Sequence, residues 1–575
     1  MDRLRRLLIA NRGEIAVRIV RACREMGIAS IVAAAPGERE GMAAWLADEV
    51  TDVSTYLDGD GLVRAAVAAS ADAVHPGYGF LSEDPSFAER VIGTGLLWVG
   101  PPPEAMRRLG DKLAARALAE AAGVPVVPGS AADDGTLVRE AERLGTPLLV
   151  KAAAGGGGRG MRAIDDLADL QRALAAARDE AGSAFGDGRV FLERRLERVR
   201  HVEVQILLDD HGNAVHLGER DCSLQRRHQK LVEESPSPAV GPDLREALGS
   251  AAVAIAERAG YRGAGTAEFL LAEDGAWWFL EMNARLQVEH PVTEAVTGVD
   301  LVRAQLEIAA GAVLGVRQDD VVARGHAVEA RVYAEDPANG FLPTGGRVDL
   351  LDLPRAPGVR IDTALRQGVV IGLGYDPLLA KVIAHAEDRP RALARLRAAL
   401  DAVRIVGVTT NLGFLLDALT RREVIDGTAD TDWVERSWTP QVPELPTGVP
   451  VSTDPSDPWI AFGPEAAGSR DPKVTVAGSH AQFRGWSFVV ADEELVAAEL
   501  SPPGGSLTAP MPAGVLEVGV EEGDEVQAGQ VLALLEAMKI QVQITAPAAG
   551  TIRTVHVRAG DVVARDQPLI ELEER

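Results

Sequence analysis

The last seventy residues contain an internal repeat, which restricts the fold of the chain more than any other feature of its sequence. Thr508-Ala509-Pro510 recurs as Thr545-Ala546-Pro547, Gly523-Asp524 recurs as Gly560-Asp561, and VLALLE is echoed by PLIELE, always at an offset of 37 residues. Repeated units of this length bury their apolar faces against each other. Because each half alternates apolar and polar residues as strands do, we predict a flattened all-β barrel with approximate two-fold symmetry.

A lysine lies at the junction of the two halves, in Glu536-Ala537-Met538-Lys539. This position between two hydrophobic strands predicts that Lys539 lies at a hairpin tip. Of the 59 basic residues only six are lysine, namely Lys112, Lys151, Lys230, Lys381, Lys473 and Lys539. Lysine offers a primary amine that can be acylated and arginine does not, so each of the six is a candidate functional residue.

The first hundred residues alternate apolar runs with amphipathic segments. LLIA leads to the helical pattern EIAVRIVRACREMG, and ASIVAAA, ADAVH and LLWVG follow as further strands. Strands that alternate with helices indicate a parallel α/β sheet. Beyond it we expect a helix at KLAARALAEAAG, another over residues 165–182, and strands at RVFLERRL and HVEVQILLD.

The length and charge of the chain limit its class. A chain of 575 residues requires several domains. A net charge of -26 without a dense arginine run argues against nucleic acid and anionic membrane surfaces as partners. The apolar run at the start is too short for a signal peptide, and no stretch is long enough to span a membrane. Only two cysteines are present, which favours a reducing, cytoplasmic compartment.

One segment, AEFLLAEDGAWWFLEMNARLQVEH, carries the strongest chemical signal. Asp274-Gly275 predicts a two-residue hairpin turn, and pairing outward from it places Glu268 directly opposite Glu281. Opposed carboxylates lie about 5 Å apart at Cβ and repel each other, so a hard cation such as Mg²⁺ between them is the natural resolution. If the chain stays extended, Asn283, Arg285, Gln287 and Glu289 share that face. A solvated strand would alternate similarly, but it rarely sets two acids opposite each other beside a buried Trp-Trp-Phe strand.

Two further segments indicate anion binding. Lys151 precedes a glycine run, Gly155 to Gly158, whose backbone could approach a phosphate group; a flexible loop would look the same. ERDCSLQRRHQK is dense in cations for an acidic chain, which favours an anion site over an exposed basic strand. Within it, Cys222 is expected to pack rather than to act as a nucleophile.

Together these segments resemble the biotin carboxylases of the ATP-grasp superfamily, and the tail resembles a biotin carboxyl carrier domain. ANRGEIAVRI, HPGYGFLSE, GDK, KAAAGGGGRGMR, ERDCSLQRRHQK, EMNARLQVEHPVTE and GHAVEARVYAED match the family signatures in order. The resemblance implies an α/β fold with five parts: a parallel α/β carboxylase domain (1–113), an ATP-grasp domain with a mobile lid (114–325), a carboxylase C-terminal domain (326–440), a linker with a short β-rich bridging segment (441–505) and a flattened-barrel biotinyl domain (506–575).

The resemblance also implies a role for each matching residue. The expected catalytic and bicarbonate-pocket residues are Lys230, Arg285, Gln287 and Val288, with Glu289 as the general base and Arg331 beside the biotin enolate. Glu268, Glu281 and Asn283 are expected to bind the metal, in agreement with the hairpin argument. Expected nucleotide-binding residues are Lys112, Lys151, Gly157, Gly158, the hinge Glu193 to Leu196, His201, Gln225 and His228. Biotin is expected on Lys539, after Ala537 and Met538.

The implied cofactors are covalent biotin, ATP and Mg²⁺ or Mn²⁺, with bicarbonate as substrate. The implied activity is carboxylation of biotin by the α subunit of an acyl-CoA carboxylase, with the methylcrotonyl-CoA type favoured by FLPTGGRV and GYDPLLAKVIAHAEDR. A propionyl- or acetyl-CoA carboxylase subunit and a non-catalytic biotin carrier remain as alternatives. Expected partners are a carboxyltransferase β subunit, a biotin protein ligase and further copies of the chain. Ile540 and Gln541 depart from the usual carrier motif.

Overall fold

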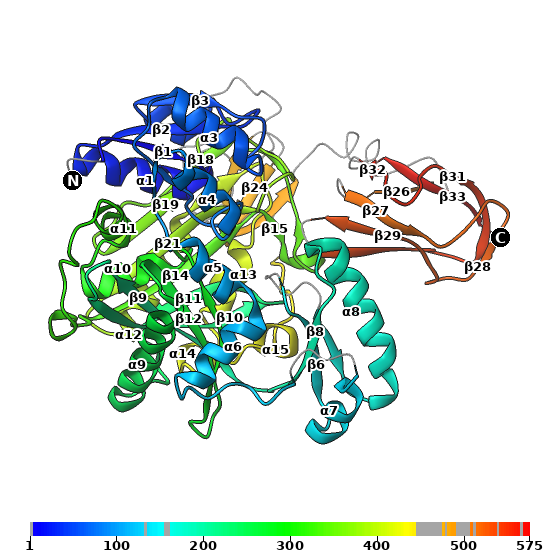
Figure 1. Cartoon of the computed structure of the whole chain (residues 1–575). Coiled ribbons are helices and arrows are strands. Elements are labelled where there is room, and N and C mark those ends of the chain that lie inside the picture. Colours follow the sequence, from blue (N-terminus) through cyan, green and yellow to red (C-terminus); the bar gives the residue numbers. More distant parts are fainter. Residues whose placement is uncertain are drawn as a thin grey trace.

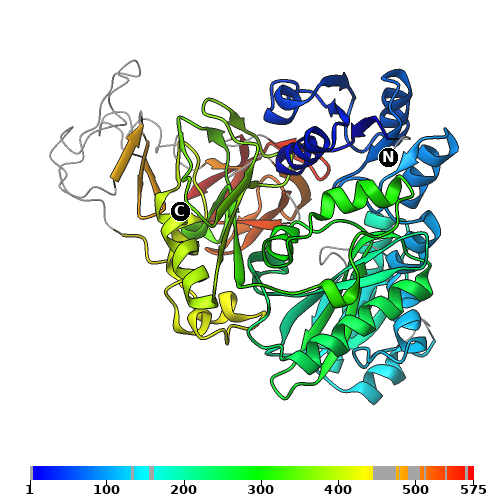
Figure 2. The ribbon, with the colours of Figure 1, turned by 90° about the vertical axis from the view of Figure 1, so that its left-hand side faces the viewer.

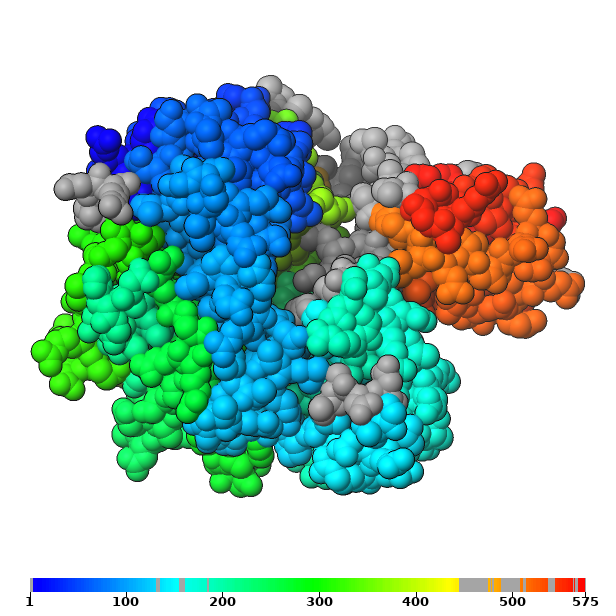
Figure 3. Space-filling model, viewed as in Figure 1, coloured from blue at the N-terminus to red at the C-terminus, as the bar shows by residue number. Residues whose placement is uncertain are grey.

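The chain folds into a large α/β part followed by a separate C-terminal barrel, which lies to one side of it (Figures 1 and 3). The computed structural model describes residues 4–130, 135–154, 161–443, 474–477, 480–489, 506–509, 513–537, 540–563 and 567–574. Gly157, Gly158, Met538 and Lys539 lie outside these ranges. No helix of the described residues is long and apolar enough to cross a membrane.

The N-terminal hundred residues form the expected parallel sheet, in the order β3-β2-β1-β4-β5. Apolar residues of β1 and α1 are buried, and Gly27 ends α1 in the left-handed conformation at φ 70°, which favours glycine. The strands are β1 (Arg6–Ile9), β2 (Ala29–Ala34), β3 (Glu49–Asp52), β4 (Ala73–His75) and β5 (Leu97–Trp98). The helices are α1 (Gly13–Met26), α2 (Met42–Leu46), α3 (Gly59–Ala68), α4 (Pro85–Gly93), α5 (Pro103–Gly110) and α6 (Lys112–Ala121).

A three-stranded sheet, β7-β6-β8, forms a small lobe with its own apolar core (Figure 1). Its elements are α7 (Leu137–Leu144), β6 (Leu148–Ala152), β7 (Arg162–Ile164), a 3₁₀ turn (Leu167–Asp169), α8 (Leu170–Phe185) and β8 (Val190–Arg194). The helix expected over 165–182 is therefore confirmed, with a start several residues later because Asp166 caps the 3₁₀ turn first.

The centre of the α/β part is one eight-stranded antiparallel sheet in the order β13-β12-β9-β10-β11-β14-β21-β19. It continues without a break from β12 and β13 to β14 and β21, so residues about 100 positions apart in sequence are held in fixed positions by one sheet. Its strands are β9 (Arg200–Leu208), β10 (Ala214–Arg226), β11 (Gln229–Ser235), β12 (Gly263–Leu271), β13 (Trp277–Asn283), β14 (His326–Tyr333), β19 (Val359–Thr363) and β21 (Leu378–Ala386).

Helices and short strands surround this sheet (Figures 1 and 2). The helices are α9 (Pro242–Ala259), α10 (His290–Thr297), α11 (Leu301–Ala309), α12 (Arg389–Ala402), α13 (Leu412–Ala418), α14 (Arg422–Ile425) and α15 (Trp433–Ser437), with 3₁₀ turns at Gln318–Asp320 and Pro337–Asn339. The short strands are β15 (Glu335–Asp336), β16 (Leu342–Pro343), β17 (Gly346–Arg347), β18 (Leu350–Asp352), β20 (Val370–Ile371) and β22 (Arg404–Val406).

The short β-rich segment expected within residues 441–505 contains a three-stranded antiparallel sheet that packs on the α/β part. Trp486 is buried in the same apolar cluster as Phe414, and the Gln482 side chain bonds the backbone of Val403, directly before β22, and of Ile405 within it. The strands are β23 (Val474–Ala477), β24 (His480–Phe483) and β25 (Trp486–Val489).

The C-terminal barrel consists of two four-stranded sheets, β26-β33-β31-β28 and β30-β29-β27-β32. The 37-residue repeat maps each strand of one sheet onto a strand of the other, which confirms the predicted two-fold symmetry. The buried apolar residues of both sheets form a separate core. The strands are β26 (Ser506–Thr508), β27 (Ala513–Val518), β28 (Glu525–Val526), β29 (Val531–Ala537), β30 (Ile540–Thr545), β31 (Gly550–Val555), β32 (Val562–Val563) and β33 (Pro568–Glu574).

Candidate active site

The β12–β13 hairpin places Glu268 opposite Glu281, as the sequence predicts, but the turn differs from the prediction. Ala272 and Ala276 close the hairpin through a 2.8 Å backbone bond, so the loop has three residues and ends on Gly275 at φ +87°. A bulge between Glu268 and Phe269 then shifts the register by one and restores the expected pairing. The predicted two-residue turn is wrong, and the predicted opposition of the two acids is confirmed.

The two opposed carboxylates have different cationic neighbours. Glu268 accepts hydrogen bonds from Lys230 Nζ (3.0 Å) and Asn283 Nδ2 (2.9 Å), and its other oxygen lies 3.0 Å from His201 Nε2. Burial alone would raise the pKa of Glu268, but Lys230 and His201 outweigh it and hold that pKa far below its usual value. Glu281 contacts Lys112 Nζ at 2.5 Å, and this ammonium lowers the pKa of Glu281. Both acids are therefore ionised at neutral pH.

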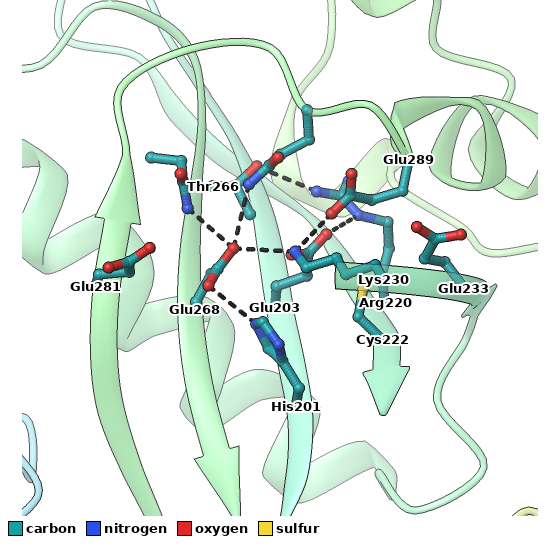
Figure 4. Close-up of polar contacts among 12 residues, drawn as sticks. His201, Glu203, Arg220, Cys222, Lys230, Glu233, Thr266, Glu268, Glu281 and Glu289 are labelled. Atoms are coloured by element: carbon teal, nitrogen blue, oxygen red, sulfur yellow. Dashed lines mark hydrogen bonds and ion pairs between the residues drawn. The ribbon is translucent and has the colours of Figure 1, made fainter. Parts of the chain in front are cut away.

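Lys230 is the central cation of the site (Figure 4). Its Nζ donates to Glu203 at 2.5 Å, to Glu268 at 3.0 Å and to Glu289 at 2.6 Å. Burial acts to lower the pKa of Lys230, but these three carboxylates raise it well above its usual value, so the ammonium stays charged. One cation thus joins an acid of the β12–β13 hairpin to the expected general base.

Glu289 is fully buried between two cations. Besides Lys230, it accepts a 2.8 Å bond from Arg331 Nη2, and Arg331 Nε is held at 2.5 Å by Glu233. Burial alone would raise the pKa of Glu289, but Lys230 and Arg331, with Arg220, hold it well below its usual value. The carboxylate is therefore ionised and able to accept a proton.

The segment from Ala284 to Glu289 is not extended, so the expected strand alternation ends at Asn283. The backbone turns because Glu83 accepts the Ala284 N–H at 3.1 Å and holds Arg285 Nε at 3.0 Å. Glu289 then forms the N-cap position of α10. The polar side chains still meet: Arg285 bonds Asn283 and Gln287 at 2.9 and 2.8 Å, and Gln287 Nε2 lies 3.3 Å from Glu268.

A second group of the expected residues lines a neighbouring cleft on the other side of Glu281. Lys151 and Arg116 both bond Glu193, the latter at 3.2 Å, and Lys112 faces Glu281. The lining residues are Lys112, Arg116, Lys151, Phe191, Glu193, Phe279, Leu280 and Glu281. Three cations and two aromatic rings in one cleft suit a nucleotide, because phosphates need positive charge and a base needs apolar walls.

The remaining expected nucleotide residues lie around this region. Leu196 is half-buried just after β8, and His228 is exposed in the β10–β11 turn at φ 64°. Gln225 Nε2 lies 3.4 Å from His201 Nδ1 and thereby links the turn to the Glu268 site. Lys230 and Gln225 come from the basic segment, which the structure therefore places at the site rather than on an exposed strand pair.

Glu203 and Glu233 are buried charged residues of the site that the sequence-based prediction lacks, and Arg220 of the basic segment is paired within the protein. Arg220 is fully buried and bonds Glu203 at 2.5 Å, Gln205 at 2.8 Å and Thr266 at 3.1 Å. Glu233 holds Arg331. A signal exists for them: Glu203 and Gln205 are alternate polar residues in the otherwise apolar strand HVEVQILL, a pattern that marks one face of a strand for polar contacts. Cys222 is buried beside them with its pKa raised by burial, as expected for a packing residue.

The donor set of the hairpin fits a hard divalent cation. Two ionised carboxylates, Glu268 and Glu281, and the amide of Asn283 are oxygen ligands of the kind that Mg²⁺ and Mn²⁺ prefer. His201, Glu203 and Glu268 also come within metal-binding reach of one another. However, the Glu203 side chain is fully buried between Arg220 and Lys230, whereas Glu281 is partly exposed and lines the cleft with Lys112 and Lys151, so the hairpin acids are the better-suited pair.

Four family models match the chain: "Biotin carboxylase, N-terminal domain" over residues 3–106, "Carbamoyl-phosphate synthase L chain, ATP binding domain" over 111–317, "Biotin carboxylase C-terminal domain" over 329–436 and "Biotin-requiring enzyme" over 505–572. Among curated relatives, a biotin carboxylase of Nostoc is 47% identical and covers 75% of this chain and 98% of its own length. An acyl-coenzyme A carboxylase alpha3 subunit of Mycobacterium leprae is 38% identical and covers 99% of both chains. The rat methylcrotonoyl-CoA carboxylase subunit alpha is 36% identical, covering 99% of this chain and 93% of its own.

Solved structures agree with these matches. The biotin carboxylase domain of Hydrogenobacter thermophilus 2-oxoglutarate carboxylase, a dimer in complex with MgADP and bicarbonate, gives a TM-score of 0.74 at 41% identity, over 75% of this chain and 97% of that one. A Campylobacter jejuni biotin carboxylase gives 0.73 at 39% identity, over 75% and 99%.

Proposed function

This chain belongs to the biotin-dependent carboxylases, and because it joins an ATP-dependent biotin carboxylase to a biotinyl domain, we propose specific roles for the residues described above. The observation that carries the proposal is the position of Glu289, fully buried and bonded to both Lys230 and Arg331. Glu289 accepts the proton of bicarbonate, which then attacks the γ-phosphate of ATP, displaces ADP and forms carboxyphosphate. Lys230 and Arg285 hold the bicarbonate, with Gln287 and the backbone of Val288.

The paired cations explain how so acidic a carboxylate can act as a base. Bicarbonate is an anion, and when it binds beside Lys230 it competes with Glu289 for the same ammonium. The proton affinity of Glu289 then rises, because the cation that lowered its pKa is shared with the substrate. The base therefore becomes effective when the substrate arrives.

The other residues divide between charge neutralisation and transfer. Lys112 and Lys151 contact the ATP phosphates, and Glu268, Glu281 and Asn283 would hold Mg²⁺, whose charge would offset that of the transferred phosphoryl group. The hinge from Glu193 to Leu196, with His201, Gln225 and His228, contacts the nucleotide. Biotin bound to Lys539 would supply the ureido nitrogen that accepts the carboxyl group, its proton leaving with the released phosphate. Arg331 would contact the ureido oxygen of that biotin.

We also propose that the chain is the α subunit of an acyl-CoA carboxylase and works with a separate carboxyltransferase β subunit, as a homo-oligomer in the cytoplasm, after modification by a biotin protein ligase. Support comes from the relatives that match over 97 to 99% of this chain, the methylcrotonoyl-CoA carboxylase alpha subunits and the Mycobacterium leprae alpha3 subunit. The methylcrotonoyl-CoA carboxylase subunits favour methylcrotonyl-CoA as the final acceptor of the carboxyl group. The alpha3 subunit leaves propionyl-CoA and acetyl-CoA as alternative acceptors. The intact buried site disfavours a non-catalytic carrier.

The test is bicarbonate-dependent ATP cleavage by the purified, biotinylated chain, followed by an acyl-CoA panel with the co-purified β subunit. ATP cleavage that requires bicarbonate and Mg²⁺, and that falls sharply in Glu289→Gln, supports the site assignment. Unchanged cleavage in that variant contradicts it. Preferred carboxylation of propionyl- or acetyl-CoA would reject the methylcrotonyl assignment and leave the carboxylase roles standing.

A further inference from the structure

Two leucines of the carboxylase part contact the core of the carrier barrel. Leu342 lies in β16 and Leu373 lies in the loop 372–376, and both are half-buried because they pack against the barrel's apolar cluster. Figure 1 shows the barrel beside β15, the partner strand of β16. We call Leu342 and Leu373 the leucine seat.

The leucine seat lies at the end of the strand pair that carries Arg331. The loop 372–376 leads into β21, whose Leu378 pairs with Tyr333 of β14, and Ala334 N–H donates to Pro377 at 2.9 Å. Arg331 is two residues before Tyr333 and reaches its hydroxyl at 3.3 Å. A domain held on the seat therefore lies at the end of the strand pair that leads to Arg331.

Each leucine has a neighbour in sequence that is held by a guanidinium group. The ring of Tyr375, two residues after Leu373, lies under Arg12 at 4.2 Å and packs edge-on against Phe80 at 6.0 Å. The ring of Phe341, directly before Leu342, lies under Arg226 at 4.4 Å. Cation–π contacts of this kind are attractive, so each leucine follows or precedes a ring that is held against the carboxylase part.

We propose that the leucine seat is the docking surface on which the carrier of the same chain rests while its biotin is carboxylated. This inference rests on the proposed function and adds the surface that brings the carrier to the site. Among the described residues the contact through the seat is apolar, as suits a domain that must leave again to reach the carboxyltransferase.

The test compares two substrates of one site, using the full biotinylated chain. In Leu373→Asp, single-turnover carboxylation of the chain's own biotin should be about tenfold slower, the effect expected for loss of one buried leucine contact. Carboxylation of free biotin should be unchanged. Val370→Asp is the matched control, because Val370 is 71% exposed on the neighbouring β20.

A second variant separates docking from folding. Leu373→Cys provides an accessible thiol, since Cys23 and Cys222 are both buried. Attaching a bulky maleimide after folding should again slow only carboxylation of the chain's own biotin, while wild type treated in the same way should be unaffected. The proposal would be overturned if Leu373→Asp and the modified Leu373→Cys both carboxylated the chain's own biotin at the wild-type rate. It would also be overturned if carboxylation of free biotin slowed as much as carboxylation of the chain's own biotin.

Mixed chains test whether the carrier serves its own site. Glu289→Gln supplies a biotinylated carrier on an inactive site, and Lys539→Arg supplies an active site without biotin. Transfer between these two chains should be much slower than in wild type; transfer at the wild-type rate would show that a second copy uses the seat. Absence of ATP cleavage and of free-biotin carboxylation in wild type would instead reject the proposed function.

Discussion

Lys381 Nζ donates a 2.8 Å hydrogen bond to the backbone carbonyl of Val288, the residue directly before Glu289. Lys381 is fully buried in β21 and also lies 3.2 Å from Glu14 of α1. It therefore fixes the turn that carries Gln287 and Glu289 from outside the site.

Lys381→Met should impair catalysis without removing any group that touches substrate. The loss of the bond to Val288 lets the Glu289 turn shift, and misplacement of about 1 Å can reduce rate by about 10²-fold. We expect kcat of bicarbonate-dependent ATP cleavage to fall while KM for ATP stays near its wild-type value, because Lys112 and Lys151 are untouched. Equal changes in both constants, measured by steady-state kinetics, would contradict a positioning role.

Glu289→Gln and Arg331→Ala should fail at different steps. Removal of a general base typically reduces rate by about 10² to 10⁴-fold, so Glu289→Gln should depress ATP cleavage itself. Arg331→Ala should reduce carboxybiotin formation more than ATP cleavage. Parallel assays of phosphate release and carboxybiotin measure both, and equal losses in Arg331→Ala would refute the division.

Glu281→Gln should weaken the dependence of ATP cleavage on Mg²⁺. Mutation of mere outer-shell partners typically costs about 10 to 100-fold in metal affinity or activity, and loss of a ligand should cost at least as much. Glu273→Gln is the matched control, since Glu273 is exposed in the loop of the same hairpin. Mg²⁺ titrations of ATP cleavage measure the effect. If both variants behave like wild type, Glu281 does not bind the metal.

Lys539→Arg should abolish biotinylation. Arginine keeps the charge but has no amine that the ligase can acylate. Intact-mass measurement after co-expression with a biotin ligase should show one biotin on wild type and on Lys473→Arg, a second lysine-to-arginine control, and none on Lys539→Arg. Biotin on the latter would place the modification elsewhere.

Glu335→Gln should stabilise the protein at alkaline but not at acidic pH. Burial raises the pKa of Glu335 from 4.5 to about 7, against the opposing effect of Arg226. The folded state thus favours the protonated acid, and stability is lost as pH rises from 4.5 through about 7. Glutamine removes this loss, so Tm relative to wild type should be higher by about 2–4 °C at pH 8 than at pH 5. The exposed Glu387→Gln should show no such difference.

The sequence predicted which strands and residues form the site better than it predicted the turns and the course of the backbone between them. The repeat, the parallel sheet and the opposition of Glu268 and Glu281 depend on local patterns, and all three are confirmed. The predicted two-residue turn is wrong because it ignores the bulge in the hairpin. Beside that bulge, the Phe279 N–H donates a 2.8 Å hydrogen bond to the backbone carbonyl of Pro125, which belongs to a distant segment. A local pattern holds no information about such a partner.

The same limit explains the end of the strand at Asn283 and the partners of Arg220. Glu83, about 200 residues earlier, turns the chain at Ala284. Arg220 is buried by Glu203, Gln205 and Thr266, which come from two other strands. Only the folded sheet brings these groups together, so the sequence could mark polar positions but not their pairing.

The unbroken eight-stranded sheet has a consequence for how the chain can be divided. The β11–β14 pair joins the strands that carry Lys230 and Glu268 to the strand that carries Arg331. A gene cut between residues 317 and 329, where two family models meet, would leave β11 and β14 each with an open edge, and such edges drive self-association. The barrel has its own closed core. Transplanting modules between relatives should therefore succeed for the barrel and fail for either half of the sheet.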